Sequence, residues 1–94
     1  MNIGELIKEA RLKKGLTQIK VAKYLNVDLS YVSKLEKGTR LPKLHIKKLS
    51  KILDIPESQM QSVYLTDLIV KQYGDNPYIL DALKRASTII KQIQ

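Results

Sequence analysis

The sequence predicts an all-α fold, and three observations support this prediction. Apolar residues recur every three or four positions along nearly the whole chain, which is the periodicity of helices with one buried face. Gly, Asn and Pro interrupt this pattern at intervals that suit short helices. No segment shows the strict alternation of apolar and polar residues that is typical of a strand.

The first two helices are expected between the N-terminus and Asn26. The first ends at Gly15, and its apolar residues are Ile3, Leu6, Ile7, Ala10 and Leu12. Thr17 is a suitable N-cap for the second helix, because its hydroxyl can accept a hydrogen bond from a free backbone N–H. The inward-facing residues of this helix are Val21, Ala22 and Leu25. Asn26 tolerates the left-handed conformation that a tight interhelical turn requires.

Two further helices are expected before Pro56. Asp28 can cap the third helix, which runs to Lys37 and stops at Gly38. Residues 39–42 are expected to form a loop, because a Pro disfavours helix at the residue before it. The fourth helix ends before Pro56, and its apolar residues are Leu44, Ile46, Leu49, Ile52 and Leu53.

Residues 57–94 form a C-terminal extension with two more helices. The apolar residues of the fifth helix are Met60, Val63, Tyr64, Leu65, Leu68, Ile69 and Val70. Residues 74–77 (GDNP) break it, and the apolar residues of the sixth are Ile79, Leu80, Leu83, Ala86, Ile90 and Ile93. Two interpretations stay open: these helices pack on the first four as core, or they form a dimer interface through Leu65, Leu68, Ile69, Ile79, Leu83 and Ile90.

Composition limits the classes of protein to consider. The chain has 94 residues and no Cys, which excludes disulfides, thiol nucleophiles and cysteine-ligated zinc. A chain this short buries a modest core, so oligomerisation is expected. No apolar run reaches membrane-spanning length, and the N-terminus has no signal-peptide core. We therefore expect a soluble cytoplasmic protein, associated with the prokaryotic nucleoid and not with a membrane.

The positive charge is confined to one part of the chain. Residues 1–56 hold 13 Lys and Arg against 5 Asp and Glu, whereas residues 57–94 hold 4 against 4. The whole net charge of +8 therefore lies in the first part. A charged surface kept for solubility would not need this confinement. The asymmetry favours a polyanion such as nucleic acid as the partner.

Residues 17–36 are the most informative segment, since they predict two short helices joined by a tight turn. Such a pair can present its second helix to the major groove of duplex DNA. The outward side of that helix has short residues first and basic residues last: Leu29, Ser30, Ser33, Lys34 and Lys37. Leu29 would contact a thymine methyl, and Lys34 would donate to guanine O6 and N7. Ser30 is equally explained by its preference for helix starts.

Residues 3–55 resemble the Cro/CI-type (Xre-family, lambda-repressor-like) helix-turn-helix domain. The matching segments are KKGLTQ at 13–18, VAKYLNV at 21–27, YVSKLEKGTRLP at 31–42 and LSKILDI at 49–55. The resemblance implies a bundle of four to five helices in a DNA-binding domain, residues 1–56, followed by the two-helix extension. It also implies a homodimer on double-stranded DNA, with residues 28–37 in the major groove.

The resemblance further implies roles for individual residues. Thr17 and Gln18 begin the helix that crosses the DNA backbone, and Gln18 would bind a phosphate or a base edge. The positions that match base readers are Leu29, Ser30, Ser33 and Lys34. Lys37, Thr39 and Arg40 match a phosphate clamp. Tyr31 would either contact a phosphate through its hydroxyl or pack at the core edge. Arg11 and Glu36 match an ion pair between the first and third helices, which we expect on the surface and of little energetic value.

Leu29 and Ile19 depart from the family pattern. Leu29 is apolar where the family often has a polar reader, which leaves its base contact open. Ile19 replaces a residue that is usually polar and exposed, and packing against a neighbour is an alternative for it.

The sequence contains few residues that would support an enzymatic function. His45, the single histidine, is expected at the surface or near a phosphate, and no carboxylates are spaced for acid–base chemistry or a metal site. We therefore expect no catalytic residues, no cofactor and no metal. The prediction is a sequence-specific transcriptional regulator, a repressor in preference to an activator, on a palindromic operator. The alternative is an antitoxin or controller protein whose residues 57–94 bind a partner protein, with DNA binding serving autoregulation.

Overall fold

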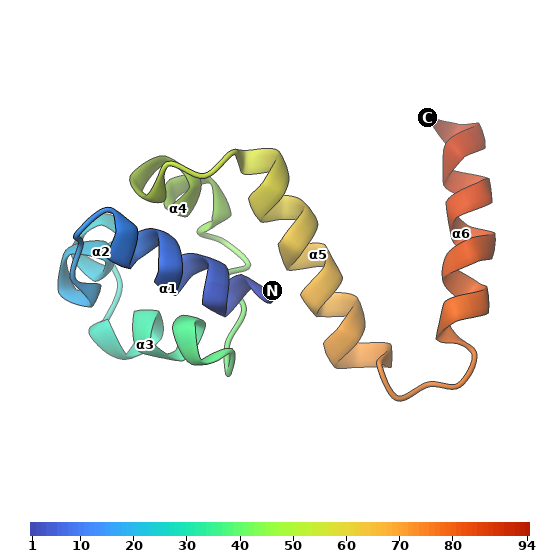
Figure 1. Cartoon of the computed structure of the whole chain (residues 1–94), viewed down its shortest axis with the longest axis horizontal. Helices are drawn as coiled ribbons and strands as arrows, with labels where there is room; N and C mark the ends of the chain where they lie inside the picture. The colour runs from blue at the N-terminus through green and yellow to red at the C-terminus, as the bar shows by residue number, and fades with distance from the viewer.

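The chain folds into six α-helices with no strand, which confirms the predicted all-α class (Figure 1). A computed structural model describes all 94 residues. The helices are α1 (Ile3–Lys13), α2 (Gln18–Leu25), α3 (Leu29–Lys37), α4 (Ile46–Leu53), α5 (Glu57–Tyr73) and α6 (Ile79–Ile93). The first four gather into a bundle, α5 leaves it as a long arm, and α6 stands apart beyond a turn (Figure 1).

The helix ends follow the expected local chemistry at Thr17, Asn26 and Gly38, but not at Asp28. The Thr17 hydroxyl accepts a hydrogen bond from Lys20 N over 3.1 Å, as predicted for an N-cap. Asn26 and Gly38 end α2 and α3 in the left-handed conformation, with φ of 58° and 79°. Asp54 ends α4 in the same way, with φ of 56°, which the sequence did not indicate. Asp28 precedes α3 as predicted, but its side chain makes no capping hydrogen bond, so that part of the prediction is wrong.

One continuous core joins α1 to α5. Thirteen buried apolar side chains form it, including Ile7, Val21, Val32, Leu35 and Leu49. Met60 from α5 is fully buried in the same cluster, so the core extends past Pro56 into the arm. Val32 and Leu35 of α3 are fully buried in this core.

Two apolar residues that the sequence assigned to helix faces lie outside the core. Leu12 is 58% exposed, at the end of α1 where the helix has passed the core. Leu44 is 85% exposed, because residues 43–45 form a turn and α4 begins only at Ile46. Pro42 is fully buried just before this turn. Its burial anchors the loop, so the chain reaches helical conformation later than the periodicity predicts.

The interpretation that both C-terminal helices pack on the first four is right for the first part of α5 and wrong for α6. Met60 is buried, and Val63 and Tyr64 pack against the core. No residue of α6 is buried. Its apolar side is therefore unpartnered within one chain. None of the six helices combines the length and the apolar run that crossing a membrane requires.

The crossing of α1 over α3 depends on Gly4. A Cβ atom at this position would lie 2.6 Å from the Leu35 carbonyl oxygen and 2.9 Å from that of Glu36. Both distances are shorter than real Cβ contacts, and both partners are backbone atoms that cannot rotate away. Any larger side chain would force the two helices apart.

We predict that Gly4→Ala lowers the free energy of unfolding by about 2 kcal/mol. Overpacking usually costs about 1–3 kcal/mol, and two backbone oxygens that cannot rotate away place this site at the upper end. Alanine offsets about 1 kcal/mol of that cost, because it favours helix relative to glycine. Urea unfolding followed by circular dichroism gives the value, with Lys8→Ala, at an exposed position of α1, as the control. A Gly4→Ala protein as stable as wild type would contradict the prediction, because the overpacking would then cost no more than the gain in helix propensity.

Candidate nucleic-acid interface

Helices α2 and α3 form the expected pair, with one side of α3 buried and the other free. Val32 and Leu35 have no exposed surface, and Ala22 is 4% exposed in the helix they pack against. A small residue at Ala22 lets the two helices approach closely. The outward side of α3 carries Leu29, Ser30 and Lys34 as exposed residues, with Lys37 exposed in the last turn. Ser33, by contrast, is half-buried.

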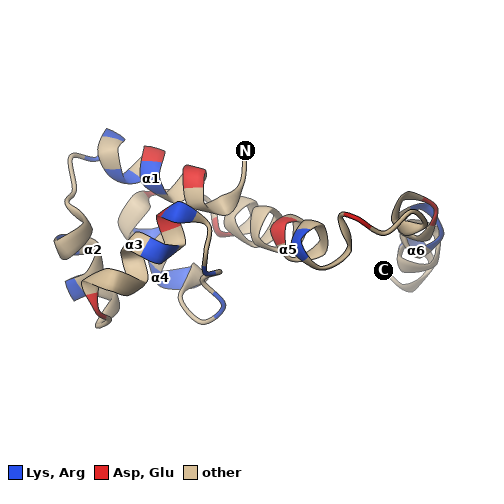
Figure 2. Cartoon of the chain, turned by 90° about the horizontal axis from the view of Figure 1, so that it is seen from below, with Lys and Arg blue, Asp and Glu red and all other residues tan.

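The basic residues lie over α1 to α4. Figure 2 shows Lys and Arg spread across these helices and the loop between α3 and α4, with few on α5 and α6. The chain has two salt bridges, Arg11–Glu36 and Arg85–Asp81. Lys34, Lys37 and Arg40 take part in neither. These three cations on and just after α3 are therefore available to an external anion.

Tyr31, Arg40 and His45 form a cluster beside α3. The Tyr31 hydroxyl and His45 Nδ1 are hydrogen-bonded over 2.9 Å, and the two rings meet edge to face. The Arg40 guanidinium carbon lies 5.0 Å from the centre of the Tyr31 ring, a cation–π contact. These contacts hold the loop after α3 against the helix. Tyr31 is half-buried and packs against the core, which agrees with the first of the two alternatives, packing at the core edge.

Burial raises the pKa of the Tyr31 hydroxyl, while the positive charge of Arg40 lowers it and offsets part of the effect. The net direction is upward, so the phenol keeps its proton at neutral pH. A protonated phenol can donate to a phosphate oxygen, whereas a phenolate would repel it.

The cluster lines a shallow hollow of about 520 Å³ beside the first two turns of α3. Its lining comes from the turn before α3, from α3 itself and from the following loop: Asn26, Val27, Asp28, Ser30, Tyr31, Lys34, Arg40 and His45. Two cations and several hydrogen-bond donors suit a phosphate group, although Asp28 adds one negative charge at the rim. His45 was not among the predicted site residues. Its contact with Tyr31 spans 14 positions and two helices, which no periodicity in the sequence reveals.

Arg11 and Glu36 form the expected ion pair, but the prediction that it lies at the surface is wrong, because the pair is buried. Their side chains are 10% and 3% exposed. Arg11 Nε donates to Glu36 Oε2 over 2.6 Å, and Nη2 donates to Oε1 over 3.1 Å. Arg11 Nη1 donates to the Leu16 carbonyl oxygen over 2.9 Å. The pair thereby fixes α3 to α1 and to the loop before α2.

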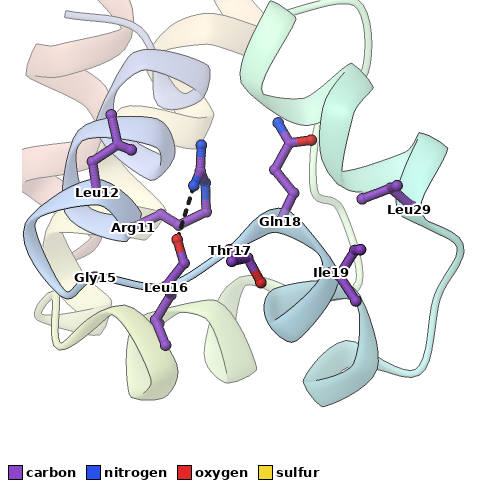
Figure 3. Close-up of a pocket in the computed structure, with 8 residues that line it drawn as sticks. All are labelled: Arg11, Leu12, Gly15, Leu16, Thr17, Gln18, Ile19 and Leu29. Carbon is purple, nitrogen blue, oxygen red and sulfur yellow. Dashed lines mark hydrogen bonds between the residues drawn. The ribbon is translucent and has the colours of Figure 1, made fainter.

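Gln18 joins this network. Its Nε2 donates to Glu36 Oε1 over 3.1 Å, and the side chain is directed from the start of α2 toward α3 (Figure 3). The side chain is half-buried, so one amide hydrogen is used inside the protein while the rest of the group lies near the surface. Gln18 is thus held in position beside the outward face of α3.

A second hollow, of about 570 Å³, lies next to this network (Figure 3). Ile19 and Leu29 line one side of it, and Leu12 and Leu16 line the other. Ile19 is 53% exposed and Leu29 is 45% exposed. The start of α3 therefore presents an apolar edge, which suits contact with a thymine methyl better than hydrogen bonding.

Comparison with known proteins places this arrangement in a family. Residues 7–59, which run from α1 to the start of α5, match a family described as helix-turn-helix. The chain belongs to this helix-turn-helix family. It is also 33% identical over 72 residues to the "ImmF control region 10 kDa protein" of Bacillus phage phi105, covering 77% of this chain and 78% of that protein. No solved structure matches.

Membership of the helix-turn-helix family confirms the resemblance found in the sequence and, with the phage relative, supports a DNA-binding regulator. The match ends at Gln59, so it covers only the first three residues of α5. The rest of α5 and the whole of α6 lie outside the matched region.

We predict that Arg11→Met and Glu36→Gln each lower the free energy of unfolding by about 3 kcal/mol, because either change leaves the other charge buried and unpaired. The double variant should cost less than the sum of the two, since no unpaired charge then remains. Denaturant unfolding of the wild type, the two single variants and the double variant gives the four free energies of this double-mutant cycle. Strict additivity of the two losses would mean that the pair does not interact.

Proposed function

We propose that this protein is a sequence-specific double-stranded DNA-binding transcriptional regulator, a dimeric repressor that acts in the cytoplasm on a palindromic operator. The observation that carries the proposal is the outward side of α3, where Lys34, Lys37 and Arg40 have no acidic partner in a chain of the helix-turn-helix family. A dimer of this kind would contact half-sites about one helical turn apart, roughly 34 Å.

In this proposal, α3 is the recognition helix. Lys34 reads a guanine, and Leu29 contacts a thymine methyl from the apolar edge that it forms with Ile19. Ser30 and Ser33 contact base edges, Ser33 with less reach because it is half-buried.

Contacts with the DNA backbone surround the recognition helix. Arg40, Thr39 and Lys37 bind phosphate on one side, and Arg40 shares its hollow with Tyr31 and His45. Thr17 and Gln18 lie at the other side, at the start of α2. Gln18 is well placed for this role, because Glu36 fixes its amide group. Contacts of this type set the register of a protein on DNA and leave sequence selection to the recognition helix.

Selection from a pool of random-sequence duplexes tests sequence specificity. Wild-type protein should enrich a motif with two inverted halves. A pool that shows no enriched motif after repeated rounds would contradict the proposal. The enriched duplex then serves as the probe for the variants below.

We predict that Lys34→Ala and Arg40→Ala weaken binding in different ways. Lys34→Ala should cost about 1–3 kcal/mol on the selected duplex and relax the preference at one base pair. Arg40→Ala should weaken selected and scrambled duplexes alike and reduce the salt dependence by about one phosphate contact. Gel-shift titrations on both duplexes at several salt concentrations give these values. If Arg40→Ala changed the base preference and Lys34→Ala did not, the two roles would be reversed.

The dimer interface is proposed on α5 and α6. In α6, Ile79, Leu83, Ala86 and Ile90 follow a spacing of four, three and four, which lines one side of a helix as in a coiled coil. Leu65 and Leu68 are exposed in α5, and Ile69 is half-buried there. In α6, Leu83 is 39% exposed and Ile90 is 48% exposed, so this side has apolar surface that a second chain can cover.

We predict that Leu83→Asp and Ile90→Asp each weaken dimerisation by about 2 kcal/mol, or roughly 30-fold in Kd. Because α6 contributes no buried residue, these changes leave the folded body intact. Thr88→Asp, on the opposite side of α6, has the same charge change and is the control. Light scattering over a concentration series measures the effect. A wild-type protein that stays monomeric at high concentration would refute the dimer and leave this surface to a partner protein, as in an autoregulated antitoxin.

A further inference from the structure

One side of α5 changes from apolar to charged as the helix leaves the body. Met60 and Tyr64 pack on the core, and Asp67 and Lys71 follow at positions seven and eleven residues after Met60. These intervals place all four on the same side of the helix. The charged pair therefore faces the body at the point where the core ends.

Asp67 and Lys71 each hold one end of a helix in the body. Asp67 Oδ2 accepts a hydrogen bond over 2.7 Å from the backbone N–H of Ile3, the first residue of α1. Figure 1 shows the N-terminus of the chain beside α5. Lys71 Nζ donates to the carbonyl oxygen of Gly38, the residue that ends α3. A carboxylate at a helix N-terminus and an ammonium group at a C-terminus both match the helix dipole.

The contact at Gly38 lies between the two parts of the proposed DNA interface. Gly38 follows Lys37 directly and precedes Thr39 and Arg40, so it joins the recognition helix to the loop that would bind phosphate. Gly38 has φ of 79°, and its position is set by the end of α3 and by the contact from α5. Lys71 thus connects the arm to the part of the body that would touch DNA.

We propose that Asp67 and Lys71 are positioning residues that fix the orientation of the recognition helix relative to the dimer axis, and so determine which half-site spacing the protein accepts. This inference rests on the proposed dimeric DNA-binding function. The arm carries the apolar dimer surface on its other sides, and the two contacts are the polar links from its outer half to α1 and α3. Without them α5 is held to the body only by the packing of its first two turns, so the helix can pivot there and each recognition helix can follow a shifted half-site.

The test uses full-length protein and the duplex selected by the wild type, with one base pair inserted at its centre or one removed. Each change moves the half-sites by about 3.4 Å and turns them by about a tenth of a helical turn. The wild type should discriminate strongly against both altered duplexes. Asp67→Ala, which removes the acceptor, and Lys71→Met should each reduce this discrimination roughly fivefold, as measured by competition gel shift at constant salt.

Opposite charge changes separate positioning from simple electrostatics. Asp67→Ala removes a negative charge and should raise general DNA affinity, whereas Lys71→Met removes a positive charge and should lower it. Both variants should nevertheless lose spacing discrimination in the same direction. Lys71→Arg should restore most of it, since a guanidinium can also donate to the Gly38 carbonyl. The matched controls are Asp75→Ala and Lys84→Met, exposed residues beyond α5 that contact neither helix end.

Three results would overturn the inference. One is unchanged spacing discrimination in Asp67→Ala and Lys71→Met when light scattering shows that both remain dimeric, which leaves the proposed function intact. Another is a change in overall affinity alone, with opposite signs for the two variants. The third is a wild-type protein that is monomeric and indifferent to spacing, which refutes the proposed dimer as well.

Discussion

The buried ion pair between Arg11 and Glu36 is the interaction on which the rest of the structure depends. Taking two charges out of water is costly, and the cost is recovered only when every donor and acceptor has a partner. Here Arg11 uses three nitrogens and Glu36 both oxygens, and no buried polar side-chain atom lacks a hydrogen bond. Since these bonds reach α1, α3, the loop before α2 and Gln18, one network sets the relative placement of all the elements that carry the interface. Apolar packing alone would tolerate small rotations of α3, whereas this network accepts a single register.

The inner and outer sides of α3 are subject to different constraints. On the inner side, Gly4 and Ala22 keep neighbouring helices close, and any extra atom would be resisted by backbone. On the outer side, Lys34 and Lys37 are exposed and take part in no ion pair. Because of this division, the domain can hold α3 rigidly. The exposed residues that we propose to contact the operator can be substituted without cost to the fold.

Local signals predicted most of the fold, and long-range contacts were the part that could not be predicted. The ends of α1, α2 and α3 follow from Gly15, Asn26 and Gly38, because a left-handed residue ends a helix wherever it occurs. Leu44 misled the periodicity, since an apolar residue in a turn is indistinguishable in sequence from one in a helix. The burial of Arg11, the Tyr31–His45 contact and the two contacts from α5 join positions 14 to 64 residues apart, so no local pattern encodes them. The family resemblance supplied the Arg11–Glu36 pairing but not its depth. Likewise, an amphipathic α6 has the same sequence whether its partner lies in its own chain or in another.

The unpartnered side of α6 has a consequence for how the protein responds to its own abundance. In the proposed dimer, this side is covered only when two chains meet, so the occupied operator rises with the square of the free monomer concentration while monomers predominate. A halving of the protein level, as occurs at cell division without new synthesis, would then lower occupancy up to fourfold. A regulator built in this way releases its target abruptly, with the threshold set by the apolar contacts of a single exposed helix.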